Sequence, residues 1–139
     1  MKTVVTFLCL TLFSSCAVSA SLLCEGSERT EYRHKGTQPY SKEKSATLTF
    51  ELENSKLENF PSCESDKTFI RCNTCQFLHQ SFEDCLRYQS GDGQRMRWEV
   101  VLNRVSGDIK STSILDIYSQ GLWSKTVFTG RCSVAKRKF

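Results

Sequence analysis

The stretch Arg95–Ser113, RMRWEVVLNRVSGDIKSTS, decides the fold that we expect for this chain. Apolar and polar residues alternate from Met96 to Asn103, which is the period of a strand with one buried face. Ser106-Gly107-Asp108 interrupts this pattern, and a second run of apolar and polar residues follows from Ile109. Two such runs around a glycine-containing turn predict a β-hairpin.

The register of this hairpin depends on the length of its turn. A two-residue Ser106-Gly107 loop would pair Val105 with Asp108, whereas a three-residue loop would pair Val105 with Ile109. The two registers place opposite sets of side chains of the second strand on the buried face. We expect the second register, because it brings two β-branched residues together across the strands.

The first 20 residues have the organisation of a secretory signal peptide. A positive residue, Lys2, precedes a short apolar run, and the small residues Ala17–Ala20 provide a cleavage site. We expect cleavage after Ala20 and a protein that is exported, either to the periplasm or into the medium. No window of the chain is apolar over the length of a membrane span, so we expect no transmembrane segment.

An alternative interpretation treats residues 13–16 as a lipoprotein box, with a lipid anchor on Cys16. Such boxes usually have leucine at the position that Phe13 occupies here. Simple cleavage after Ala20 is therefore the preferred prediction.

Removal of the signal leaves a single domain, residues 21–139, with six of the eight cysteines. An even number of cysteines in an exported chain of this size is typical of a disulfide framework. The sequence does not determine the pairing, although we expect Cys24 to join Cys132 and so connect the terminal strands. The six residues are Cys24, Cys63, Cys72, Cys75, Cys85 and Cys132.

The Cys72-Asn73-Thr74-Cys75 motif allows two alternatives, a redox pair or a zinc site completed by Cys63 and Cys85. Only one short C-x-x-C knuckle is present, and an oxidising compartment favours disulfides over metal-bound thiolates. We therefore expect no metal and no cofactor.

Further segments complete the predicted domain. Ala46–Glu53 alternates clearly and predicts a strand, and Trp123–Cys132 predicts the last strand. The polar residues 27–45 predict a long exposed connection and a place for a binding loop. Leu78, Phe82, Cys85 and Leu86 are spaced as on a helix, with Asn73 as its N-cap. The fold class that we expect is mainly β, a small antiparallel barrel or curved sheet with one short helix.

Sequence motifs for catalysis are weak in this chain. His34 and His79 are the only histidines, and they would be the acid–base pair of a small secreted hydrolase of phosphodiesters. Arg95, Arg97 and Arg104 near Trp98 and Tyr88 could stack on and neutralise a polyanion. The formal net charge of +4 is too small to predict nucleic-acid binding, and none is expected.

Three short motifs carry a resemblance to a group of exported proteins. They are Cys24-Glu25-Gly26, Asn103-Arg104-Val105-Ser106-Gly107 and Gly130-Arg131-Cys132, and the chain ends in basic residues and Phe139. In these respects the chain resembles small exported proteins of Gram-negative bacteria with a Cys-x-Gly start and a late Gly-x-Cys. The resemblance implies no activity and no catalytic residues.

The function that we expect is therefore non-enzymatic. The chain would be a small exported binding protein for an unknown protein or small ligand, for example an enzyme inhibitor. The alternative is the small hydrolase that would use His34 or His79.

Overall fold

The computed structural model describes residues 19–77, 94–117 and 120–135. All strand pairs are antiparallel, and the order across the single sheet is β3-β2-β1-β8-β7-β6-β5-β4. The edge strands β3 and β4 contact each other, so the sheet nearly closes into a barrel. The strands are β1 (Ser19–His34), β2 (Tyr40–Glu53), β3 (Lys56–Leu57), β4 (Ser62–Ser65), β5 (Phe69–Phe77), β6 (Gln94–Asn103), β7 (Asp108–Ile117) and β8 (Leu122–Val134).

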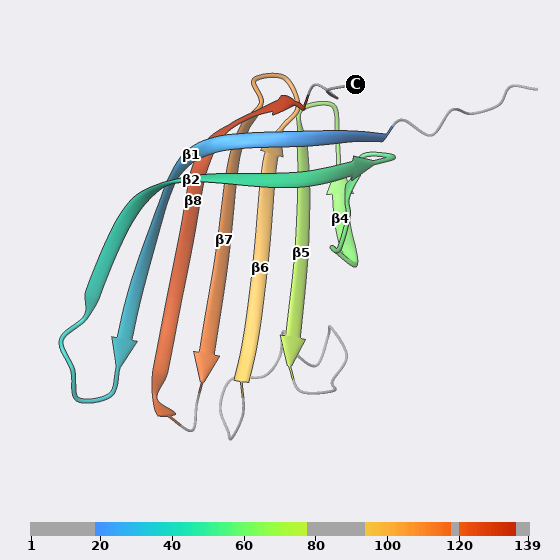
Figure 1. Ribbon diagram of the computed structural model, residues 1–139. Coiled ribbons are helices and arrows are strands. Elements are labelled where there is room, and N and C mark those ends of the chain that lie inside the picture. Colours follow the sequence, from blue (N-terminus) through green and yellow to red (C-terminus); the bar gives the residue numbers. More distant parts are fainter. Residues whose placement is uncertain (1–18, 78–93, 118–119, 136–139) are drawn as a thin grey trace, which may run out of the picture.

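This architecture confirms the expected fold class, a mainly β domain with an antiparallel, barrel-like sheet and disulfides. Figure 1 shows that one half of the β1–β2 pair crosses one end of the other strands and that the pair then curves, so that its other half runs alongside β8. The ring of Phe50 on β2 lies 6.1 Å from that of Trp98 on β6, so the crossing half of the β1–β2 pair packs on the sheet.

The hydrophobic core lies between the crossing half of β1–β2 and the inner face of β5, β6 and β7. The alternation of β6 places Val100 and Leu102 on this inner face, and both are buried. The other members of the buried cluster come from nearly every strand and are Leu22, Cys24, Phe50, Leu57, Phe60, Ile70, Cys72, Ile109 and Phe128.

The predicted β6–β7 hairpin is confirmed, but both registers considered for it are wrong. The structure pairs Leu102 with Ile109, because the turn is longer than either alternative. The Asn103 side-chain oxygen accepts hydrogen bonds from the backbone N–H groups of Val105 and Ser106. Gly107, at a φ of 79°, then donates to the Asn103 carbonyl. An Asx-type turn therefore forms at Asn103 in place of further pairing between β6 and β7.

The prediction of a long exposed connection at residues 27–45 is wrong. β1 continues to His34 and β2 begins at Tyr40, so only a short turn remains between them. The two strands pair over their full length, from Ser19 opposite Glu53 to Tyr32 opposite Tyr40. Polar side chains on both faces of this pair hide the period-2 pattern that identifies a half-buried strand.

The predicted helix stripe at Leu78–Leu86 lies outside the described residues. Its expected N-cap, Asn73, is part of β5 and pairs with Glu99 of β6, so the helix start at Asn73 is wrong. The predicted strands at Ala46–Glu53 and Trp123–Cys132 are confirmed within β2 and β8.

The disulfides join residues that face each other on neighbouring strands. Cys24 is bonded to Cys132 as expected, with Cα atoms 3.9 Å apart, and Cys63 is bonded to Cys72, with Cα atoms 4.1 Å apart. Cys75 is also disulfide-bonded, and its partner lies outside the described residues. Because Cys72 is bonded to Cys63, neither a Cys72–Cys75 redox pair nor a zinc site with Cys63 and Cys72 is present.

The three motifs that carry the resemblance meet at one corner of the sheet. Gly26 lies opposite Gly130, next to the Cys24–Cys132 bridge. The N–H of Cys132 donates to the carbonyl of Gly107 at 2.8 Å. These segments therefore form a structural corner that holds the crossing strands to the β6–β7 turn.

An ion pair closes the same corner. The Arg131 guanidinium donates to the Asp108 carboxylate at 3.1 Å, and the Ser106 hydroxyl donates to it at 2.7 Å. The Ser106 hydrogen bond, followed by that from Arg131, holds the pKa of Asp108 below its ordinary value.

Candidate functional site

Trp98 lies on β6 at the point where the inner face of the sheet changes from covered to exposed. Along β6, Val100 is fully buried, Trp98 is half-buried and Met96 is 36% exposed. The crossing half of the β1–β2 pair covers Val100, and this cover ends near Trp98. A large aromatic side chain therefore lies at the mouth of the core rather than inside it.

The position of the Trp98 ring is fixed from several sides. Its indole N–H donates to the hydroxyl of Ser111 on β7 at 2.6 Å. The rings of Phe50 and Phe60 pack against it at centroid distances of 6.1 and 4.7 Å. A tryptophan held in this way presents a preformed wall to a ligand with little loss of side-chain entropy on binding.

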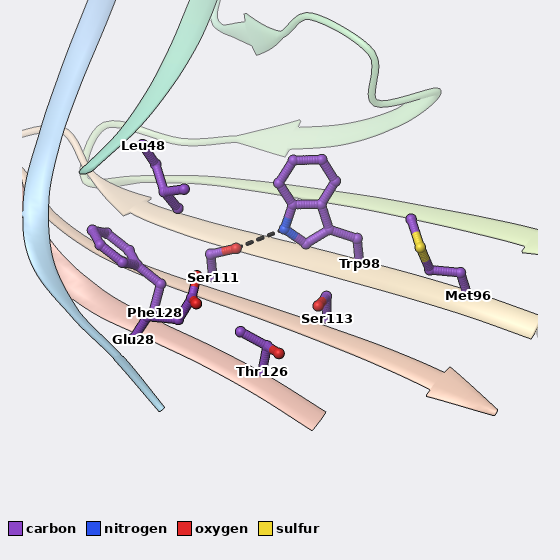
Figure 2. Close-up of a pocket in the computed structure, with 8 residues that line it drawn as sticks. All are labelled: Glu28, Leu48, Met96, Trp98, Ser111, Ser113, Thr126 and Phe128. Atoms are coloured by element: carbon purple, nitrogen blue, oxygen red, sulfur yellow. Dashed lines mark hydrogen bonds between the residues drawn. The ribbon is translucent and has the colours of Figure 1, made fainter. Parts of the chain in front are cut away.

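A cavity of about 230 Å³ lies beside Trp98. Figure 2 shows its lining side chains projecting from the inner face of β6, β7 and β8 and from β1 and β2. Apolar walls come from Leu48, Met96, Trp98 and Phe128, and polar groups come from Glu28, Ser111, Ser113 and Thr126. This combination of an apolar lining with a few hydroxyls and one charge is typical of small-ligand sites.

A second cavity, of about 150 Å³, shares the lining residue Glu28 with the first. It lies between the curved halves of β1 and β2 and is lined by Glu28, Thr30, Tyr32, Lys42 and Lys44. The Lys44 ammonium lies 3.1 Å from the Glu28 carboxylate, and the Glu28 side chain is 20% exposed. The rings of Tyr32 and Tyr40 stack beyond it at 6.1 Å.

The outer face of the sheet carries a different polar group. The Arg95 guanidinium donates to the Asp116 carboxylate at 3.1 and 3.3 Å, and both side chains are nearly buried. Arg97 lies 3.9 Å from the same carboxylate. A carboxylate shared by two arginines in this way holds neighbouring strands together, so we assign it a structural role.

The structure does not bring the predicted catalytic histidines into this site. His34 is exposed at the end of β1, where its backbone carbonyl accepts hydrogen bonds from the N–H and the hydroxyl of Thr37. His79 lies outside the described residues. The hydrolase alternative therefore gains no support from the placement of His34.

The residues of the polyanion hypothesis are also separated. Trp98 faces the inner side of β6, whereas Arg95 and Arg97 lie on the outer side with Asp116. Arg104 donates to the carbonyl of Asp66 in another turn, and Tyr88 lies outside the described residues. The described members of the set form no common surface.

Sequence reasoning missed most of the cavity residues, although one signal for them was present. Residues 27–45 were expected to contain a binding loop, and Glu28, Lys42 and Lys44 do lie there, but on strands. The alternation of Leu48, Phe50 and Leu52 continues backwards to Lys44 and Lys42 on the same face. That extension predicts inward-facing lysines, provided that the strand is known to continue.

Comparisons of the chain with family models, curated proteins and solved structures find no match. Among the described residues, no helix is long and apolar enough to cross a membrane.

Proposed function

We propose that this chain is an exported, non-enzymatic binding protein whose ligand occupies the cavity beside Trp98. The observation that supports this proposal is the half-buried indole of Trp98, fixed by Ser111 at the open end of the core. A cavity of about 230 Å³ is smaller than the roughly 300–1,000 Å³ of sites for drug-sized compounds, so a small ligand fits better than a protein surface.

The disulfides are compatible with export, because such bridges persist in oxidising compartments. The signal peptide at residues 1–20 remains a prediction that agrees with them. Binding without chemistry is favoured because the polar groups beside Trp98 are hydroxyls and an ion-paired carboxylate.

Binding can be measured by the fluorescence of Trp98 itself. The chain has two tryptophans, and Trp123 lies on the outer face under the guanidinium of Arg33. In a Trp123→Phe background, Trp98 is the only reporter. Octanol, octanoate and octylamine share one apolar chain, so we expect at least one of them to shift the Trp98 emission in a saturable way.

A cavity-filling variant tests whether these probes bind where we propose. Ser113 lies opposite Trp98 across β6 and β7 and lines the cavity, whereas Thr112 faces the outer side. Ser113→Phe should abolish the emission change, and Thr112→Phe, the matched control, should retain it. Absence of saturable binding for all three probes, or equal binding by both phenylalanine variants, would contradict the proposal.

A further inference from the structure

The charge at the open end of the cavity suggests the class of ligand. Glu28 lines both cavities, and we call the two together the hollow, which has its apolar wall at Trp98 and the lysines of β2 at its other end. Lys44 is already paired with Glu28. Lys42 lines the outer cavity and makes no ion pair with the described residues. The hollow therefore carries one positive charge in excess at its polar end.

The apolar end has the opposite character. Leu48, Met96, Trp98 and Phe128 provide contact area but no charge, and the Trp98 N–H is used by Ser111. A ligand that fits both ends has an apolar chain or ring and a negatively charged head.

We propose that the ligand is a small anionic amphiphile, with its apolar part against Trp98 and its carboxylate or similar anion near Lys42. This inference rests on the proposed function and adds the ligand class to it. Lys44 contributes by neutralising Glu28, which would otherwise repel an anion in the same hollow.

Lys42 also has a simpler explanation. An inward-facing lysine on an edge strand opposes pairing with a second sheet, and β2 is an edge strand over most of its length. The two roles make different predictions. Edge protection concerns self-association, whereas the proposed role concerns the preference for an anionic head over a neutral one.

The experiment compares the affinities of octanoate, octanol and octylamine for the disulfide-bonded chain that carries Trp123→Phe. We expect octanoate to bind most tightly and octylamine least. Lys42→Gln should weaken octanoate binding by about two- to fivefold, the factor for an exposed ion pair, and leave octanol binding unchanged. Lys110→Gln removes the same charge from the outer face and is the matched control.

Salt provides a second measurement. Octanoate affinity should fall as sodium chloride is raised, because screening weakens the attraction to Lys42, and octanol affinity should not fall. If octanol or octylamine binds as well as octanoate, or if Lys42→Gln and Lys110→Gln behave alike, the ligand class is wrong but the binding proposal stands. If Lys42→Gln only promotes self-association, measured by sedimentation, edge protection is its role and the inference fails.

Discussion

At the scale of single residues, Gly26 and Gly130 set how closely β1 and β8 approach. They lie opposite each other in the register, next to the Cys24–Cys132 bridge. A Cβ atom on Gly26 would lie 2.1 Å from the Thr129 carbonyl oxygen, and one on Gly130 would lie 2.4 Å from the carbonyl oxygen of Glu25. Both contacts are with backbone, which cannot move aside as a flexible side chain can.

We therefore expect Gly26→Ala to lower the free energy of unfolding by about 3 kcal/mol or more, since the backbone of the strand pair must shift. Gly36→Ala is the comparison, because a Cβ there meets no atom within 4 Å and only the positive φ of 81° opposes it. That cost is about 1–2 kcal/mol. Urea unfolding of the oxidised proteins measures both values, and equal losses would show that the close approach is unimportant.

At the scale of elements, β2 combines one paired edge and one open edge. Its register with β1 has no bulge, so its backbone groups point alternately toward β1 and away from it. The Glu51 carbonyl accepts from the N–H of Glu58, on the side away from β1. By alternation, the N–H groups of Ser45 and Thr47 also point away, and that of Ala46 points toward β1.

This alternation predicts opposite outcomes for two neighbouring proline substitutions. Ala46→Pro removes a hydrogen bond to β1 and should cost about 3 kcal/mol, whereas Ser45→Pro removes an N–H on the open edge and should cost about 1 kcal/mol or less. Unfolding in urea gives the two values. A larger loss for Ser45→Pro would mean that its N–H is bonded and that the edge is not open there.

At the scale of the whole molecule, the two described disulfides differ in the length of chain that they close. Cys24 and Cys132 are 108 residues apart, and Cys63 and Cys72 are 9 apart. In the chain-entropy model the first stabilises the fold by about 4.7 kcal/mol and the second by about 2.6 kcal/mol. The first bridge also holds the crossing strand β1 against β8.

We expect Cys24→Ala with Cys132→Ala to destabilise the protein by about 2 kcal/mol more than Cys63→Ala with Cys72→Ala. Thermal or urea unfolding of the two double variants measures this difference, and the intact chain is the reference. A smaller loss for the Cys24–Cys132 variant would show that chain entropy does not control the stability of this domain.

The sequence determined the parts of this protein that depend on neighbours along the chain. Alternation identified β6, β7, the second half of β2 and β8, because each buries one face and shows it as a period of two. The cysteines indicated a disulfide framework, and the terminal positions of Cys24 and Cys132 suggested their pairing. The β6–β7 turn was also located, although its register was not.

Tertiary structure alone decided the candidate site. β1 and β2 continue through residues 27–45 with polar side chains on both faces, so no local pattern marks them as strands. Their curvature decides that Val100 is covered and that Met96 is exposed, although both belong to the same face of β6. The hollow at Trp98 and the inward-facing Lys42 exist because strands distant in sequence cross there. The alternation of residues along one strand shows which face is buried, but it does not show where another strand stops covering that face.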